Sequence, residues 1–213
     1  MSAAADSESQ ISPLDALARL REGNKRFATG VRSLDAMLSH TRRAELANTQ
    51  SPFAIILGCS DSRAPAEILF DQGLGDLFVI RVAGNIVAPS QVGSVEFAAE
   101  RFGTPLVVVL GHTGCGAIAA TLETMQNRGS QSPNILSIVQ RVRPSVETLM
   151  ATDLRNDPAR LYHEAVRANV RASADHLRHG SALLERLILD GRLLVVGAEY
   201  SLDSGEVDFF DGV

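Results

Sequence analysis

The sequence predicts an α/β fold in which helices flank a central, mostly parallel sheet. Short apolar runs rich in β-branched residues are continuous rather than alternating, as in strands that are buried on both faces. Stretches with the apolar spacing of helices separate these runs, which is the pattern of βαβ units. The chain has 213 residues, of which 45% are hydrophobic. That length suits one domain over residues 1–213, with enough apolar side chains for a sizeable core.

The N-terminal region predicts helices. Residues 1–12 are largely polar, and we expect them to be flexible. Pro13–Ala28 predicts a helix that ends before Gly30, because its apolar residues recur at near-helical spacing. Those apolar residues are Leu14, Leu17, Leu20 and Phe27. Ala36–Asn48 predicts a second, shorter helix.

The remainder of the chain alternates strands and helices. Four apolar runs predict buried strands, at Phe53–Leu57, Leu77–Val82, Leu106–Leu110 and Leu193–Ala198. Val207–Phe210 follows an Asp203-Ser204-Gly205 turn and predicts a short edge strand. Helical patterns cover Val92–Phe102, Gly116–Gln126, Ile135–Met150 and Pro158–His179. The last pattern carries one apolar stripe, made of Val166, Val170, Ala174 and Leu177.

Composition excludes several classes of partner and site. The net charge of −5 argues against nucleic acids and acidic membranes as partners. No apolar stretch approaches the ~20 residues of a membrane-spanning helix. The start of the chain lacks the basic and apolar regions of a secretory signal. We therefore expect a cytoplasmic protein, whose two cysteines stay reduced.

Both cysteines stand just past a predicted strand. Cys59 is the first residue of the segment Cys59-Ser60-Asp61-Ser62-Arg63. Cys115 is the fourth residue of the segment His112-Thr113-Gly114-Cys115-Gly116. Ligands in open α/β sheets bind at the carboxyl ends of strands, where the strand order reverses. If the first and third strands are neighbours, both loops open onto one crevice. Two thiolates and one imidazole then form a site with a fourth position open, which is typical of catalytic zinc.

The residues around these cysteines favour acid–base chemistry. Cys115 begins a predicted helix, whose N-terminus favours the thiolate form of the side chain. Asp61 could orient a water, accept its hydrogen bond or occupy the fourth position on the metal. Arg63 could hold Asp61 through a bidentate hydrogen bond. Two unrelated buried thiols and a structural Asp61–Arg63 ion pair are the alternative interpretations of these residues.

These segments resemble the β-class carbonic anhydrases. The two metal motifs occur in that family's order, and the similarity extends to Glu22–Phe27, Arg81–Asn85 and Gly197-x-x-Tyr200. The resemblance implies that Cys59, His112 and Cys115 bind one zinc per chain and that Asp61 and Arg63 form a catalytic dyad. It implies reversible hydration of CO₂ to bicarbonate and a proton.

The family's architecture implies further expectations. The parallel strands are expected in the order 2-1-3-4, with a helical arm over residues 13–48 that wraps a partner subunit. Active sites at a dimer interface make a homodimer, or a higher homo-oligomer such as a dimer of dimers, the expected assembly. The resemblance also implies a substrate pocket, whose matching residues are Gln50, Phe78, Ala83, Phe97 and Gly116. Phe97 occupies a position that is often tyrosine, so it lacks that hydroxyl.

Bicarbonate inhibition at a secondary site, known in some members, is not expected here. That site uses a Trp-Arg-Tyr grouping, which Arg81 and Tyr200 match in part, but Ile56 stands at the tryptophan position. We therefore expect an open metal site at neutral pH, with Asp61 turned towards Arg63 rather than bound to the metal.

The remaining histidines carry weaker signals. His176 and His179 lie three residues apart at the end of a predicted helix, where cations are usual for electrostatic reasons. His163 lies within the same helix, and His40 lies in a basic segment. Any of these imidazoles could shuttle protons, because histidine titrates near neutral pH.

Three other functions fit the same residues. A hydrolase of CS₂ or COS would use the same scaffold and chemistry on another linear carbon substrate. A non-catalytic, zinc-stabilised binding module would have Asp61 as its fourth ligand. A thiol redox protein is disfavoured, because the chain has no C-x-x-C pair.

Overall fold

The computed structural model describes residues 11–33, 43–44, 46–126 and 131–213. They form a five-stranded sheet in the order β2-β1-β3-β4-β5. The strands are β1 (Ala54–Gly58), β2 (Leu77–Arg81), β3 (Leu106–His112), β4 (Leu194–Tyr200) and β5 (Val207–Asp211). The first four pair in parallel, and β5 pairs antiparallel with β4 at the edge. The predicted strand order and the edge strand are both confirmed.

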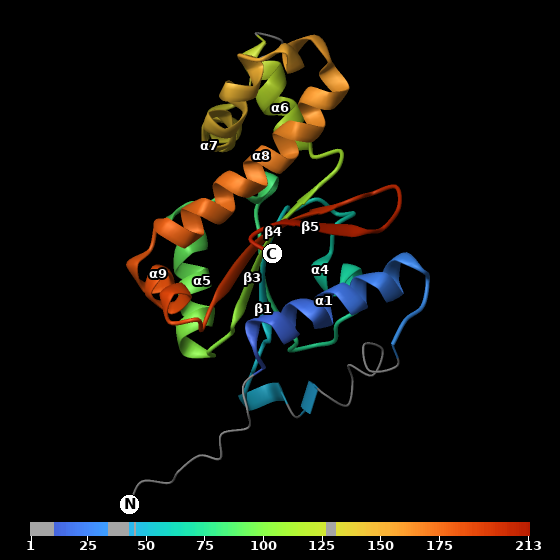
Figure 1. Cartoon of the computed structure of the whole chain (residues 1–213), viewed down its shortest axis with the longest axis vertical. Coiled ribbons are helices and arrows are strands. Elements are labelled where there is room, and N and C mark those ends of the chain that lie inside the picture. The colour runs from blue at the N-terminus through green and yellow to red at the C-terminus, as the bar shows by residue number, and fades with distance from the viewer. Residues whose placement is uncertain (1–10, 34–42, 45, 127–130) are drawn as a thin grey trace, which may run out of the picture.

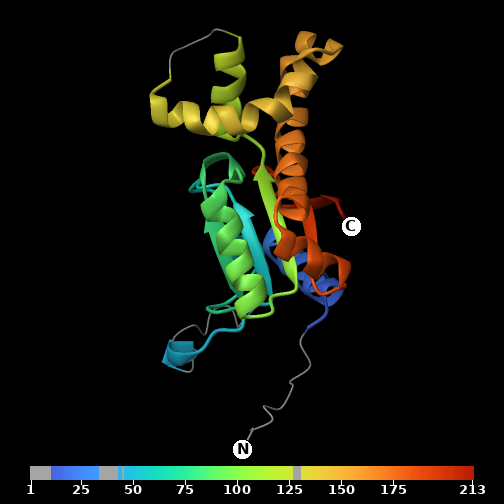
Figure 2. The same ribbon diagram turned by 90° about the vertical axis from the view of Figure 1, so that its left-hand side faces the viewer.

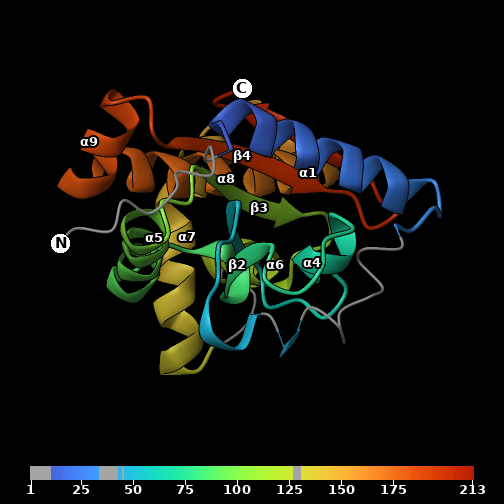
Figure 3. The ribbon, with the colours of Figure 1, turned by 90° about the horizontal axis from the view of Figure 1, so that it is seen from below.

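Helices cover both faces of the sheet (Figure 1). On one face lie α1 (Pro13–Ala28) and the short α4 (Ala66–Leu69), whose side chains join one apolar cluster. On the other face, α5 (Pro89–Arg101), α8 (Pro158–His179) and α9 (Ala182–Leu189) pack in a second cluster. Figure 3 shows α1 on the opposite side of the strands from α5 and α9. The strands β1, β3 and β4 are almost entirely buried, in agreement with their continuous apolar runs. The prediction that β2 is buried is wrong, because this strand lies near the edge of the sheet and is only half-buried.

A helical lobe stands beyond the carboxyl end of the sheet (Figure 2). It consists of α6 (Gly116–Met125), α7 (Pro133–Met150) and the N-terminal part of α8. Its apolar interior includes Ile118, Val142, Val146 and Leu161, and both cysteines belong to the same cluster. Because α8 continues from the lobe onto the sheet, one helix spans both parts of the molecule (Figure 1).

Three short 3₁₀ segments complete the described structure: η1 (Leu46–Asn48), η2 (Ala83–Asn85) and η3 (Asp153–Asn156). Within the helix predicted over Ala36–Asn48, the structure describes residues 43–44, which are helical, and η1. Most of that prediction lies outside the described residues, as do residues 1–10 of the segment that we expect to be flexible. Ser12 caps α1, since its side chain accepts a hydrogen bond from the Asp15 N–H.

Helix predictions agree with the structure except in detail. The stripe on α8 is buried, and Gly30 follows the end of α1 with a φ of 72°. Leu14 belongs to the predicted apolar spacing of this helix but does not join the core, because its side chain is 70% exposed. Leu14 lies about 120° around the helix from Leu20, so it leaves the stripe that Leu17 and Leu20 bury. The helix α9 was not predicted, because a mostly apolar run of only eight residues could equally be a buried strand.

Candidate metal centre

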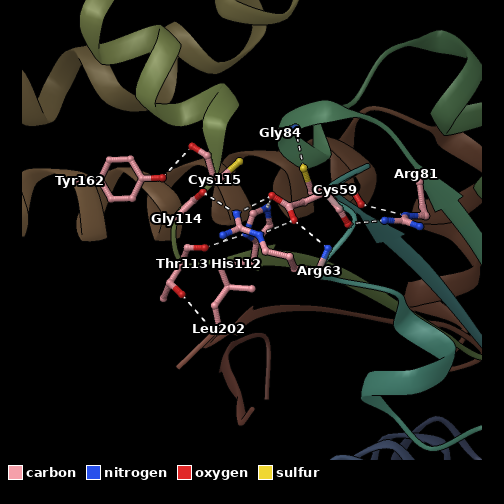
Figure 4. Close-up of polar contacts among 11 residues, drawn as sticks. Cys59, Arg63, Arg81, Gly84, His112, Thr113, Gly114, Cys115, Tyr162 and Leu202 are labelled. Atoms are coloured by element: carbon pink, nitrogen blue, oxygen red, sulfur yellow. Dashed lines mark hydrogen bonds and ion pairs between the residues drawn. The ribbon is translucent and has the colours of Figure 1, made fainter. Parts of the chain in front are cut away.

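Two neighbouring strands bring the three predicted ligands together. Gly58 at the end of β1 pairs with Leu110 of β3, so the loops that follow open side by side. Cys59 follows β1, His112 ends β3, and Cys115 is the N-cap residue of α6. Their donor atoms, the two Sγ atoms and an imidazole nitrogen, all lie within 4.8 Å of one another. Figure 4 shows the side chains converging on one point.

The donor set fits a metal ion. His112 is only 1% exposed, and its Nε2 atom has no hydrogen-bond partner among the described residues. Nδ1 of the same ring lies 2.8 Å from the Thr113 carbonyl oxygen, to which it can donate a proton. That bond leaves the lone pair of Nε2 for a ligand, as in many metal-binding histidines. A buried nitrogen without a partner beside two free thiols is the expected arrangement of a zinc site.

The surroundings of the two thiols shift their pKa values in opposite directions. The hydrogen bond from Cys115 lowers the pKa of Cys59 to about 4, and His112 and the Gly84 N–H contribute in the same direction. The same bond to Cys59, together with burial, raises the pKa of Cys115. Burial is the largest single influence and disfavours the charged form of His112, but the nearby Cys59 sulfur, the Thr113 carbonyl and the Asp61 carboxylate together outweigh it and raise the imidazole pKa. The cluster therefore favours the thiolate form of Cys59, which is the form that binds a metal.

A glycine shapes the backbone beside Cys59. The Gly84 N–H in η2 donates a hydrogen bond of 3.4 Å to the Cys59 Sγ. Gly84 has a φ of 72°, and a Cβ there would lie 2.9 Å from the Ala117 Cβ. A larger residue would be strained in conformation and would crowd the start of α6. Close approach of η2 to the cluster therefore requires glycine.

Asp61 and Arg63 form a bidentate ion pair at the mouth of this cluster. The Arg63 Nε–H donates to Oδ1 at 2.9 Å, and Nη2 donates to Oδ2 at 2.8 Å. The Arg63 backbone N–H adds a third bond to Oδ1, also at 2.9 Å. These bonds hold the pKa of Asp61 well below its usual range. Asp61 Oδ2 lies 3.8 Å from His112 Nε2, so the ionised carboxylate faces the position that a metal would occupy.

Other side chains hold the backbone of the ligand loops. Arg81 donates to the carbonyl oxygens of Cys59 and Asp61. Arg63 also reaches the Gly114 carbonyl, at 3.3 Å. On the opposite side of the cluster, the Tyr162 hydroxyl donates to the Cys115 carbonyl at 2.7 Å (Figure 4). Burial raises the pKa of Tyr162, so this hydroxyl stays a donor.

The predicted pocket residues fall into two groups. Ala83 lies in η2 and Gly116 begins α6, so both adjoin the ligand residues. Phe78 pairs with Ile55, four residues before Cys59, which corresponds to about 13 Å along the strand. Within one chain, the structure does not bring Phe78 to the cluster.

Phe97 and Gln50 belong with Phe78 rather than with the metal centre. The Phe97 ring lies 6.4 Å from that of Phe78 and 5.5 Å from that of Phe102, measured between ring centroids. Gln50 and Phe102 line a common surface cavity of about 1000 Å³. We call Gln50, Phe78, Phe97 and Phe102 the aromatic face.

Sequence reasoning missed Tyr162 and Asn169. Tyr162 contacts the Cys115 backbone, and Asn169 donates a 2.8 Å bond to the Gly84 carbonyl. No local motif marks either residue, because both act across more than 45 residues of sequence. A polar Asn169 on the apolar side of a helix, between Val166 and Val170, was the one signal in the sequence.

The other described histidines stay outside this centre. His163 Nε2 lies 3.6 Å from Glu199 Oε2, and His179 Nδ1 lies 3.8 Å from Glu185 Oε1. His176 lines a cavity between α5, α7 and α8. His40 lies outside the described residues.

Comparison with known proteins agrees with this geometry. The family model for carbonic anhydrase matches residues 54–207. Carbonic anhydrase 2 of Mycobacterium tuberculosis is 39% identical over 201 residues, which cover 94% of each chain. The β-carbonic anhydrase CafA of Aspergillus fumigatus superposes with a TM-score of 0.72 at 26% identity, covering 94% of this chain and 91% of that one.

A further structural neighbour shares the fold. Tetrameric β-carbonic anhydrase from Sordaria macrospora has a TM-score of 0.72 at 23% identity, covering 92% of this chain and 97% of the other. Among the described residues, no helix combines the length and apolar character that crossing a bilayer requires. The family match spans more than half of the chain and includes all three clustered donors. The chain belongs to the β-class carbonic anhydrase family.

Proposed function

We propose that this chain catalyses the zinc-dependent, reversible hydration of carbon dioxide to bicarbonate and a proton, at a site made by Cys59, His112 and Cys115. One observation carries the proposal. Three buried donor atoms lie within 4.8 Å of one another, and an ionised carboxylate faces the same point. Family membership supports the reaction class, and this arrangement supports the residues that we assign to it.

Zinc suits these donors, because two sulfurs and one imidazole nitrogen match a borderline-soft ion and leave a fourth position for substrate. When bound, zinc supplies a Lewis acid that makes a water nucleophilic near neutral pH. The chain contributes a preformed set of ligands, of which Cys59 has its pKa lowered to about 4. His112 is oriented by its bond to the Thr113 carbonyl. One zinc per chain is expected.

Asp61 and Arg63 act on the oxygen atoms of the reaction. Two side-chain bonds from Arg63 keep Asp61 ionised and hold its carboxylate beside the fourth metal position rather than on the metal. A carboxylate held in that orientation accepts a hydrogen bond from the reacting water and aligns its lone pair with the carbon of CO₂. The short Asp61–His112 separation of 3.8 Å supports this role.

The same loops support an open site without the secondary bicarbonate grouping. Arg81 donates hydrogen bonds from its Nε and one terminal nitrogen to the carbonyl oxygens of Cys59 and Asp61. Ile56, at the position where tryptophan would contribute, is fully buried in β1. Arg81 therefore serves the ligand loop rather than an anion, and we expect no inhibitory bicarbonate site of the usual form.

A second copy of the chain would complete the substrate pocket. Gln50, Phe78 and Phe97 match pocket positions but gather at the aromatic face, away from the metal donors of their own chain. Phe97 is 54% exposed, although it is a large apolar side chain. We infer a homodimer or higher homo-oligomer in which each aromatic face lines the partner's site. The tetrameric neighbour from Sordaria macrospora supports such an assembly.

Reduced thiols support a cytoplasmic location. Cys59 and Cys115 are both free, and a thiolate must stay reduced to serve as a metal ligand. Fractionation of the native host's cells, with an antibody against the chain, would test this location.

Metal analysis combined with stopped-flow CO₂ hydration tests the function. We expect one zinc per chain and a rate that falls when zinc is removed and returns when it is restored. Zinc-loaded protein that fails to hydrate CO₂ would refute the proposal. Parallel assays with COS and CS₂ address the sister hydrolase, because zinc sites can attack either gas by similar chemistry. If the chain turned over COS or CS₂ in preference to CO₂, that compound would become the assigned substrate.

A further inference from the structure

Two side chains of helix α8 donate hydrogen bonds to backbone oxygens, one at Cys115 and one next to Cys59. Tyr162 donates to the carbonyl oxygen of Cys115 itself, at 2.7 Å. Asn169 donates to the carbonyl oxygen of Gly84 at 2.8 Å, and the Gly84 N–H in turn donates to the Cys59 Sγ. One helix is therefore connected to the Cys115 backbone directly and to the Cys59 sulfur through one glycine.

The spacing on α8 makes this connection a single rigid span. Tyr162 and Asn169 are seven residues apart, which is two helical turns and places both on one side of the helix. Asn169 is buried, and Ser173, one further turn along, donates to the neighbouring Asn85 carbonyl at 3.1 Å. Val166 and Val170 pack the same region of the helix into the core. A span held by packing at several turns resists movement of either end.

Neither bond is needed by α8 for its own secondary structure. The helix begins with Asp157 as its capping residue and buries an apolar stripe that includes Ala165, Val166 and Val170. Phenylalanine in place of Tyr162 and leucine in place of Asn169 would both suit an α-helix, because neither lost bond lies within α8. The two polar groups instead reach backbone atoms of the metal centre.

We propose that Tyr162 and Asn169 are positioning residues that set the separation of the Cys59 and Cys115 sulfurs, and thereby the affinity for zinc. The inference rests on the proposed zinc site. Residues that orient metal ligands typically change metal affinity about 10- to 100-fold when they are lost. We expect Tyr162→Phe to weaken zinc binding about 10-fold, because the phenyl ring still packs in the lobe while the bond to Cys115 is lost.

Zinc affinity and a spectroscopic signature test the proposal together. Zinc is titrated against a chromophoric chelator in the full-length chain, for the parent, Tyr162→Phe, Asn169→Leu and the double variant. Cobalt is then substituted for zinc, since thiolate-to-cobalt absorption responds to ligand geometry as well as to binding. Each single variant is expected to weaken zinc binding and shift the cobalt bands, with a larger loss in the double variant. Far-ultraviolet circular dichroism verifies folding in each case.

Ser145→Ala is the matched control. It removes a hydroxyl bond of 2.7 Å to the Val142 carbonyl in the same lobe, and among the described residues Ser145 makes no hydrogen bond to the metal centre. We expect parental zinc affinity and cobalt absorption from this variant. A comparable loss in Ser145→Ala would show that general loosening of the lobe weakens the site, which would overturn the specific role of Tyr162 and Asn169.

The remaining outcomes are also decisive. Parental zinc affinity and unshifted cobalt bands in folded Tyr162→Phe would overturn the proposal. If that variant did not fold, Asn169→Leu would decide by the same criteria. Failure of the parent chain to bind zinc would instead refute the proposed zinc site, so the two failures are distinguishable.

Discussion

The metal centre and the aromatic face lie on the same sheet but are built in opposite ways. Cys59, His112 and Cys115 are each at most 7% exposed, and they come from strand ends and a helix start within one chain. The aromatic face lies along β2 and α5, and its Phe97 is 54% exposed. The donors already converge, whereas the aromatic face turns large apolar surface outwards.

This difference indicates that metal binding and the substrate pocket depend on different parts of the molecule. Ligand geometry depends on neighbouring strands β1 and β3, whose pairing is part of the folded core. The substrate pocket, by our proposal, depends on association of two chains, which buries apolar surface such as that of Phe97. Changes at the metal centre should therefore remove chemistry without separating the subunits. Changes at the aromatic face should separate subunits without removing zinc.

Loss of a metal ligand should have the largest effect. Cys59→Ser and His112→Ala are each expected to lose bound zinc and nearly all CO₂ hydration, because a donor atom is removed or weakened. Their thermal midpoints should also fall, since metal binding stabilises the folded state. Elemental analysis, stopped-flow assays and calorimetry measure these three effects. Ser60→Ala, next to Cys59, is the control, and full zinc occupancy in either ligand variant would contradict the assignment.

Loss of the dyad should separate metal binding from turnover. Asp61→Asn and Arg63→Ala are expected to retain zinc but to lower kcat about 100-fold or more, the usual contribution of a positioned acid–base group. Arg63→Lys keeps the charge but loses the bidentate geometry, so an intermediate rate is expected. Zinc content and kcat are measured on the same samples. Parental rates in both Asp61→Asn and Arg63→Ala would reduce the ion pair to a structural role.

A charge on the aromatic face should separate the subunits. Phe97→Glu is expected to weaken the dimer at least about 30-fold, as for loss of a central contact worth about 2 kcal/mol. Zinc should remain at one per chain while kcat/KM falls. Analytical ultracentrifugation measures the dissociation. Leu189→Glu is the control, because Leu189 is 81% exposed on α9 and lies outside the aromatic face. An unchanged assembly in Phe97→Glu would exclude this face as the interface.

The pH dependence should be the smallest of these effects and distinguishes the roles of water and carboxylate. Two thiolates reduce the acidity of the water that zinc activates, so CO₂ hydration should rise from about pH 7 to about pH 9. Asp61 should not contribute to this rise. Its folded pKa is lowered, so its ion pair with Arg63 stabilises the fold above the unfolded pKa of about 3.9 and is lost only as pH falls through the lower folded value.

Stopped-flow rates across this range test the rise, and a crystal structure of the zinc-loaded chain near neutral pH tests the state of Asp61. We expect one non-protein oxygen in the fourth position. Direct coordination of zinc by Asp61, with Arg63 released, would contradict the open site and leave the family assignment intact.

Much of the fold could be predicted because it is encoded locally. Continuous apolar runs identify β1 to β4, and the glycine turn before Val207 identifies the edge strand β5. The position of each cysteine directly after a strand was also visible in sequence. Parallel strands have their carboxyl ends on one edge, so these two positions pointed to a common site before any distance was known.

Tertiary structure decided what depends on packing and long-range contacts. Leu14 has an apolar side chain like the core residues, but its angular position on α1 turns it towards solvent. Tyr162 and Asn169 carry no local motif, and only the path of α8 across the lobe and the sheet brings them to Cys115 and Gly84. Likewise, the family resemblance implied that Gln50, Phe78 and Phe97 line the substrate pocket, whereas within one chain they lie at the aromatic face. Periodicity reports which way a side chain faces within its own element, and the distances between elements follow only from how those elements pack.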